Sequence, residues 1–164
     1  MHLTAIVRYG ADLPGVGAML ADEAFVAEKV RASGALSHHV AIVGDADHAF
    51  TVTTRRQMPT TGIPAQLRSF VGSTLEVRQV EAWEAQAHGE RHGTVVVEIT
   101  GAPVRLTGTM RLVPEPDGST TGHLVANLKS SVPLFGSAVE DAAATAMRAA
   151  LQAEEQAAAT WLAR

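Results

Sequence analysis

Histidines and carboxylates are the side chains in this sequence whose types are best suited to chemistry. The chain has seven histidines, 17 Asp and Glu residues and no cysteine, so disulfides, thiolate metal sites and cysteine nucleophiles are excluded. A zinc site needs about three or four converging ligands, and no such grouping is evident. His88 and His92 flank an expected turn, and adjacent His38 and His39 point to opposite faces of a strand. We therefore expect solvated histidines, no bound metal and no cofactor.

Acid–base chemistry is the reaction type that the remaining polar residues could perform. It needs a proton donor or acceptor within about 3 Å of a substrate, and the candidates are Arg56, Glu98, His123 and Glu154. Strand alternation places Glu98 on an outer face, whereas the strand of His123 and Asn127 leaves open which face is inward. Neither a Gly-x-Ser-x-Gly elbow nor a Gly-Lys-Ser/Thr phosphate loop occurs. We assign no catalytic residue on this basis.

Arg56 is the charged residue whose expected position is most informative. Alternation puts it on the same side of its strand as Phe50, Val52 and Thr54, and a buried guanidinium needs a partner. The candidate partners are Glu154, near the edge of the apolar face of the last helix, and the carboxylate of a bound ligand. In the alternative interpretation a bulge or the strand end lets Arg56 reach water, because arginine side chains commonly extend along apolar surface to solvent.

Composition defines the class of protein that positions these residues. The chain has 164 residues, a net charge of −4, and 46% hydrophobic but only 4% aromatic residues. These values are typical of one folded domain, residues 1–164, with a core of small aliphatic side chains. The acidic balance without a basic run argues against nucleic acid or a membrane surface as a partner. With no stretch of ~18 apolar residues and no signal peptide, we expect a cytoplasmic protein without membrane insertion.

Changes in hydrophobic period divide the chain into elements. Alternation in residues 2–9 predicts a half-buried strand, and Asp12 and Asp22 can cap two short helices that follow it. Residues 36–132 read as strands separated by turn residues. Each strand has one apolar and one polar face, which is typical of an antiparallel sheet.

The segment 59–71 interrupts the strands, because two prolines and a glycine within it break pairing. A short helix is expected to begin at Pro64. Two roles remain open for this segment, which crosses one end of the sheet. It is either a gate for ligand entry or a static plug in which Leu67 and Phe70 cap the core.

The tail, residues 133–162, is rich in alanine and has no helix breaker after Gly136. It predicts a closing helix of roughly 25 to 30 residues, about 40 Å long, with a capping box formed by Ser137 and Glu140. A single long helix hides its apolar stripe only by lying across a strongly curved sheet. The predicted fold class is therefore α+β, with a curved antiparallel sheet of about seven strands around the C-terminal helix.

The order of elements and several local motifs resemble the START-like superfamily, also called SRPBCC or the helix-grip fold. Its members include pollen-allergen-like proteins, lipid-transfer domains and polyketide cyclases. Within it, the chain looks like a bacterial family of unknown function. The motifs that carry this resemblance are Met19-Leu20-Ala21-Asp22, Thr53-Thr54-Arg55-Arg56, Phe70-Val71-Gly72, Gly101-Ala102-Pro103-Val104 and Val132-Pro133-Leu134-Phe135-Gly136.

The resemblance implies an internal cavity between the long helix and the concave face of the sheet. We expect it to bind or transport a small hydrophobic or amphipathic molecule, lipid-like or polyketide-like, since an apolar pocket with a few polar groups is the usual small-molecule site. The middle of the helix face is almost entirely alanine, so it either leaves space or packs tightly against the sheet. The expected ligand-binding residues are Arg56, Phe70, Val97, Leu106, Met110, Leu128, Phe135, Val139, Ala143, Ala146 and Met147.

Two other function classes stay open at this point. The first is a cyclase, dehydratase or hydrolase that uses the same cavity, and it requires at least two of the acid–base candidates to converge there. The second is a protein-interaction module that holds no ligand. Fold alone does not decide among them, because one fold hosts many functions.

Overall fold

We describe the protein from a computed structural model of residues 1–164, in which the side chain of Phe70 lies outside the described part. Its order of elements confirms the predicted one of strand, two helices, further strands and a long last helix. The elements are β1 (His2–Tyr9), α1 (Leu13–Leu20), α2 (Glu23–Ala32), β2 (Ser37–Gly44), β3 (Phe50–Pro59), α3 (Ala65–Val71), β4 (Thr74–Trp83), β5 (Arg91–Thr100), β6 (Val104–Pro114), β7 (Thr120–Ser130) and α4 (Gly136–Leu162).

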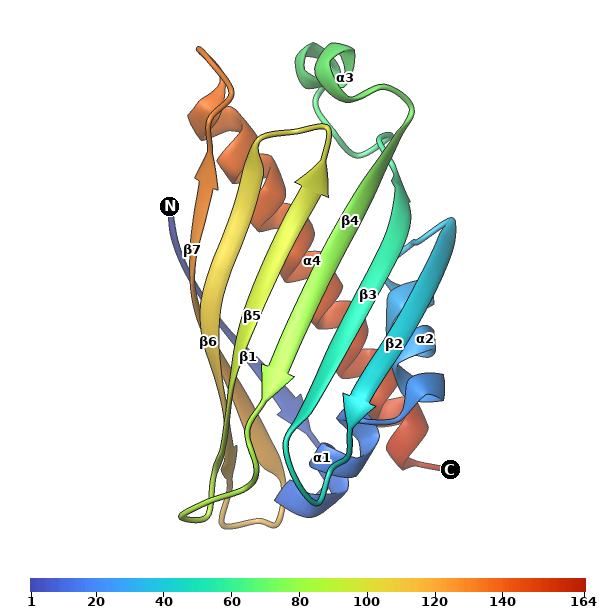
Figure 1. Cartoon of the computed structure of the whole chain (residues 1–164), viewed down its shortest axis with the longest axis vertical. Coiled ribbons are helices and arrows are strands. Elements are labelled where there is room, and N and C mark those ends of the chain that lie inside the picture. Colours follow the sequence, from blue (N-terminus) through green and yellow to red (C-terminus); the bar gives the residue numbers. More distant parts are fainter.

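The strands form one seven-stranded antiparallel sheet in the order β1-β7-β6-β5-β4-β3-β2. The sheet curves, and α4 runs obliquely across its concave side (Figure 1). This is the predicted helix-grip arrangement. Among the described residues, no helix is both long and apolar enough to cross a membrane.

Alternating burial along the strands separates a concave face from a convex one. In β3, the side chains of Phe50, Val52 and Thr54 are buried, whereas Arg55 is exposed. The same period in the neighbouring strands lines the concave side with apolar residues. Position in this alternation therefore decides which polar residues face α4.

The two short helices begin at the aspartates expected from the sequence. Asp12 accepts a hydrogen bond from the backbone N–H of Gly15 at 2.9 Å. Asp22 accepts one from Ala24 at 2.8 Å. Both bonds satisfy amides that the first helical turn leaves unpaired.

The capping box expected at the start of α4 is wrong. The helix already begins at Gly136, so Ser137 lies inside its first turn. Glu140 instead accepts a hydrogen bond from the backbone N–H of Ser130 at 3.1 Å and lies 3.4 Å from the N-terminal amine. This carboxylate therefore joins α4 to the ends of β7 and β1.

Two apolar clusters fill the space between the sheet and the helices. The helical cluster, around α1, α2 and the C-terminal half of α4, includes Phe25, Phe50 and Trp83. The sheet cluster, around the N-terminal half of α4, includes Val97, Leu106 and Leu128. Because the two clusters occupy opposite halves of the interior, α4 contributes a different set of side chains to each.

A glycine permits the close packing of the largest side chain on the sheet. Gly93 pairs with Trp83 across β4 and β5, and a Cβ at Gly93 would lie 2.7 Å from Cε3 of the indole ring. The ring therefore covers the backbone of Gly93, an arrangement that no larger residue at this position allows without movement.

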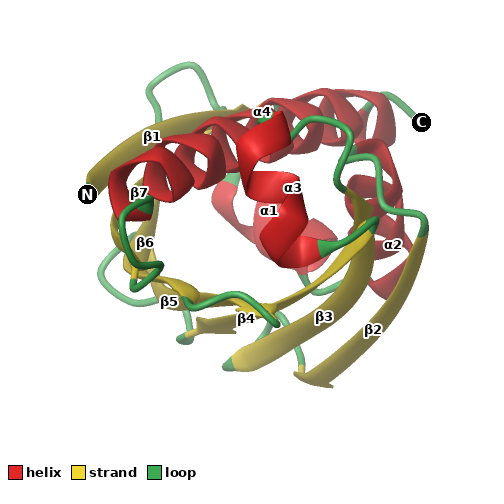
Figure 2. Ribbon diagram, turned by 90° about the horizontal axis from the view of Figure 1, so that it is seen from above, coloured by secondary structure: helices red, strands yellow, loops and turns green.

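The segment between β3 and β4 leaves the sheet as predicted, and α3 begins directly after Pro64. In the view along the long axis, α3 lies over one end of the layer between α4 and the sheet (Figure 2), and α1 lies at the opposite end (Figure 1). Arg68 holds the segment together, since its guanidinium donates to the carbonyls of Ile63 and Thr61 at 2.9 and 3.0 Å. Leu67 is buried.

Candidate functional site

Apolar side chains that face α4 but keep accessible surface define the candidate site. On the sheet, Met58, Ile99 and Met110 occupy inward positions of β3, β5 and β6 and are only partly buried. On α4, Val139 and Met147 also pack against the sheet cluster and are only partly buried. Together these side chains form an apolar wall that their neighbours do not fully cover, and one of them, Ile99, also lines a hollow at the ends of β4 to β7.

The structure brings together most of the residues expected to bind a ligand. Val97, Leu106 and Leu128 are buried in the sheet cluster. The residues that pack against this cluster while partly buried are Met110, Val139, Ala143 and Met147. Phe135 is half-buried directly before α4, and the side chain of Phe70 lies outside the described part.

Ala146 is the residue whose expected orientation is wrong, because it is exposed. The buried alanines of α4 are Ala144 and Ala158. Most residues around position 146 are alanines of equal size, so the sequence does not show which side of this part of the helix faces the sheet. The larger residues Met147 and Leu151 decide this side instead, since they pack against the sheet cluster.

A buried ionic network forms the polar wall of the interior. Lys29 of α2 is 7% exposed. Its Nζ lies 3.1 Å from Oε1 of Glu81 on β4 and 3.3 Å from Oε2 of Glu154 on α4. Three elements that are distant in sequence therefore meet at one ammonium group, and neither carboxylate is left without a cation.

Neutral donors add further hydrogen bonds to both carboxylates. The hydroxyl of Tyr9 donates to Oε1 of Glu154 at 2.7 Å. For Glu81, the amide of Gln79 donates to Oε1 at 2.6 Å, and the indole N–H of Trp83 donates to Oε2 at 3.3 Å. Buried polar networks of this kind stabilise a fold only when their members are hydrogen-bonded.

The network shifts the protonation of its members. Burial alone would lower the pKa of Lys29, but the charges of Glu154 and Glu81 outweigh burial and raise it. Burial alone would raise the pKa of Glu81, but the charge of Lys29 and the hydrogen bonds to this carboxylate outweigh burial and lower the pKa. Burial and Glu154 together raise the pKa of Tyr9 well above 10.0. At neutral pH the lysine and Glu81 are therefore charged, and the phenol keeps its proton.

Arg56 faces the interior beside this network, as strand alternation predicted, but its expected bond to Glu154 is absent. Its two terminal nitrogens donate to neutral acceptors, Oγ1 of Thr54 at 3.4 Å and Oε1 of Gln79 at 3.3 Å. Burial lowers the pKa of Arg56, and the charges of Glu81 and Glu154 oppose this effect.

The remaining acid–base candidates lie on the convex face. Glu98 is 42% exposed and lies 2.8 Å from Arg105. His123 and Asn127 alternate with the buried residues Leu124, Ala126 and Leu128, which settles the open question of their face. Within the described part of the chain, no group of three or more His, Asp or Glu could hold a metal ion.

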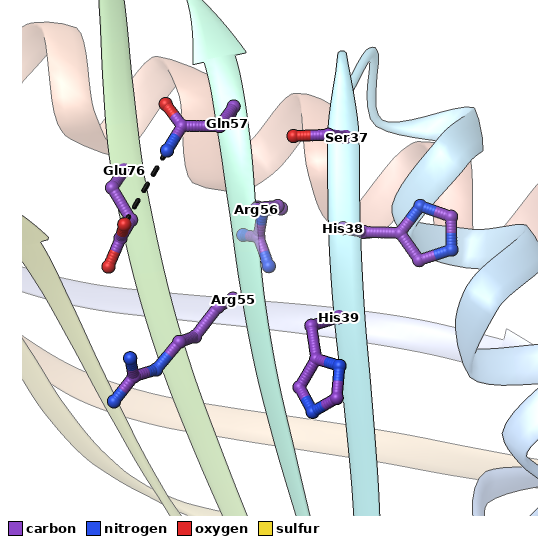
Figure 3. Close-up of a pocket in the computed structure, with 7 residues that line it drawn as sticks. All are labelled: Ser37, His38, His39, Arg55, Arg56, Gln57 and Glu76. Atoms are coloured by element: carbon purple, nitrogen blue, oxygen red, sulfur yellow. Dashed lines mark hydrogen bonds between the residues drawn. The ribbon is translucent and has the colours of Figure 1, made fainter.

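Shallow hollows open where the ends or edges of strands meet the surface, and inward as well as outward residues line them. One, of about 210 Å³, crosses β2, β3 and β4 and is shown in Figure 3, where Gln57 donates to Glu76 at 3.5 Å and Arg55 and Arg56 extend to different sides of β3. The other, of about 540 Å³, lies at the ends of β4 to β7 and is lined by Arg78, Glu98 and Arg105 among others. The first is lined by polar and charged side chains, whereas the lining of the second also includes Ile99, Ala102 and Val104, which belong to the sheet cluster or pack against it.

Sequence reasoning missed Lys29, Glu81, Gln79 and Tyr9 as members of a polar site. The signal was present in the pattern. Lys29 shares a helix face with Phe25 and Val26, and Glu81 shares strand parity with Trp83. A charged residue at an apolar position indicates a buried partner, although the sequence does not show which one.

Comparison with known proteins places this architecture in a family. The family model described as "Protein of unknown function (DUF2505)" matches residues 4–162. The chain belongs to this family. None of the curated proteins matches it.

Solved structures similar to this DUF2505 chain share its fold at low sequence identity. Crystal structures of TTHA0849 from Thermus thermophilus and of a conserved protein from Geobacillus kaustophilus are 15% and 14% identical, with TM-scores of 0.66 and 0.59. A START superfamily protein from Mycobacterium smegmatis is 13% identical, with a TM-score of 0.59. Each comparison covers 98% of this chain. It covers 98% of TTHA0849, 96% of the Geobacillus protein and 98% of the Mycobacterium protein. The fold is therefore START-like, as the sequence motifs indicated.

Proposed function

We propose that this DUF2505 protein binds a small hydrophobic or amphipathic molecule between α4 and the concave face of the sheet. The observation that carries the proposal is the set of inward apolar side chains that remain partly exposed, among them Met58, Met110 and Met147. Exposed apolar surface inside a fold is unfavourable in water, and an apolar ligand removes it from water.

The START-like fold supports this proposal. The structural neighbours named above include a START superfamily protein, and a further neighbour, Ara h 8.0201, is 10% identical with a TM-score of 0.53. In our proposal, α3 and the turns beside it form the entrance, because this segment crosses one end of the interior. The segment is short and rests on the core through Leu67.

The enzyme alternative has weaker support from the geometry. Only two of the four acid–base candidates, Arg56 and Glu154, face the interior, and Glu154 is held by Lys29 and Tyr9. Both oxygens of Glu154 therefore already accept hydrogen bonds from within the protein. We therefore propose binding rather than turnover.

Mass spectrometry under native conditions tests this proposal on gently purified protein, with extraction of any bound molecule. We expect a non-covalent ligand, and saturable uptake of the neutral apolar dye Nile red by the extracted protein. Repeated recovery of empty protein, together with no saturable uptake of the dye or of fatty acids, would contradict the proposal.

A matched pair of variants locates the site. Ala143 of α4 packs against the sheet cluster, whereas Ala149 of the same helix is exposed. We expect Ala143→Phe to weaken dye binding by filling the space, and Ala149→Phe to leave it unchanged. Equal affinities in the two variants would place the dye elsewhere on the protein.

A further inference from the structure

Arg56 is partly buried and has an incomplete set of hydrogen bonds. Its Nε is buried and has no hydrogen-bond partner among the described residues. Its other contacts, to Thr54 and Gln79, are long bonds of 3.4 and 3.3 Å to neutral oxygens. A guanidinium has five N–H donors in a planar fork, so most of its donor capacity is unused here. An unpaired buried donor carries a desolvation cost that a bound acceptor removes.

The nearby carboxylates do not supply the missing acceptor. Glu81 is bound by Lys29, Gln79 and Trp83, and Glu154 is bound by Lys29 and Tyr9. Both act on Arg56 only through their charge. The outer face offers a direct contrast, because Arg105 there lies 2.8 Å from Glu98. The negative charges of Glu81 and Glu154 therefore act on the charge of Arg56 from a distance, whereas the N–H group at Nε has no hydrogen-bond acceptor among the described residues.

Resting on the proposed function, we propose that Arg56 binds the carboxylate of an amphipathic ligand whose hydrocarbon part lies against the sheet cluster. Nε and the adjacent terminal nitrogen carry parallel N–H bonds, and this fork matches the two oxygens of a carboxylate. Met58 lies two positions further along β3 on the same face and belongs to the apolar wall. The polar end of the ligand would thus lie two residues along the strand from its apolar path.

The charges of the interior favour a singly charged head group over a phosphate monoester. Two cations, Lys29 and Arg56, already face two carboxylates, Glu81 and Glu154. A monoanion adds one negative charge and compensates for it with two strong hydrogen bonds, whereas a dianion adds a second charge that Lys29 and Arg56, which already face carboxylates, do not neutralise. Another arginine, Arg91, is buried and donates to the carbonyls of Ala46, His48 and Glu84. The ligand class is therefore that of fatty acids and similar apolar monocarboxylic acids.

Two ligands with the same hydrocarbon chain test this inference, namely dodecanoate and dodecan-1-ol, by displacement of Nile red. The protein should prefer the acid by about tenfold or more, which is the range for a hydrogen bond to a charged group. Arg56→Gln should remove that preference while binding of the alcohol is retained. Arg55→Gln is the matched control on the opposite face of the same strand, and it should keep the preference.

Further measurements make each outcome decisive. Urea unfolding without ligand checks that Arg56→Gln is folded, and Arg56→Lys, which keeps the charge but loses the fork, should retain only part of the preference. Equal binding of acid and alcohol by the unchanged protein, or an undiminished preference in a folded Arg56→Gln variant, would overturn the carboxylate assignment and leave the proposed function standing. Binding of neither ligand, nor of longer and shorter homologues, would overturn both.

Discussion

The ammonium group of Lys29 on α2 lies 3.3 Å from a carboxylate oxygen of Glu154 on α4. This contact ties two helices together inside the apolar core, and the same ammonium reaches the sheet through Glu81. The arrangement explains why α4, whose inward face is mostly small residues, has a fixed position over the sheet. It also separates the interior into an ionic region and the apolar wall assigned to ligand binding.

Replacing Lys29 tests the structural role of the network. In Lys29→Met, two buried carboxylates lose their cation, and we expect the free energy of unfolding to fall by about 3–5 kcal/mol. Urea unfolding at neutral pH measures this change. Arg31→Met on the exposed side of the same helix is the control, with an expected effect within about 0.5 kcal/mol. A similar small effect for both variants would show that the network contributes little.

The pH dependence of stability follows from Tyr9, the one tyrosine of the chain. Burial and Glu154 raise its pKa above 10.0, so the folded protein holds the phenolic proton where the unfolded chain has released it. The stability that this group contributes is therefore complete below pH 10.0 and is lost as the pH rises further. Ultraviolet absorbance of the phenolate should show ionisation of the folded protein only above the ordinary pKa.

Tyr9→Phe isolates this contribution. Loss of the hydrogen bond to Glu154 should lower the free energy of unfolding by about 0.5–1.5 kcal/mol at about pH 7. Above pH 10.0 the stability of the variant should fall less steeply than that of the unchanged protein, because one titrating group is gone. Lys29 continues to titrate in both proteins. Parallel pH profiles would refute the raised pKa of the phenol.

The close approach of Gly93 and Trp83 predicts the effect of a single methyl group. In Gly93→Ala the new Cβ would lie 2.7 Å from the ring and 2.9 Å from the carbonyl of Ala82, so strand or ring must move. We expect a loss of about 1–3 kcal/mol and a change in the near-ultraviolet circular dichroism of tryptophan. Gly62→Ala, where nothing lies within 4 Å, should leave both unchanged. Equal stability of the two variants would contradict this packing.

Element order was predictable because each boundary depends on local chemistry. The helix caps at Asp12 and Asp22, the helix start after Pro64 and the alternation of β3 are set by a few neighbouring residues, and the structure confirms all of them. Alternation also predicted that Arg56 faces inward.

The remaining features depend on contacts between distant residues. The orientation of Ala146 was wrong because a run of alanines carries no size contrast. The ionic network was missed because its central pair, Lys29 and Glu81, are 52 positions apart. Gln79, rather than Glu154, bonds to Arg56 because Glu154 is already held by Lys29 and Tyr9, which no local pattern shows.

Methyl NMR of methionine tests the central claim, binding in the interior, most directly. The chain has five methionines, of which Met58, Met110 and Met147 lie on the apolar wall. Met19 is buried in the helical cluster and Met1 is at the N-terminus, so these two are internal references. On titration with dodecan-1-ol, the three wall methyl signals should shift together and saturate, while those of Met19 and Met1 stay in place. Saturable shifts confined to Met1 or Met19, or no shifts at all, would contradict the account.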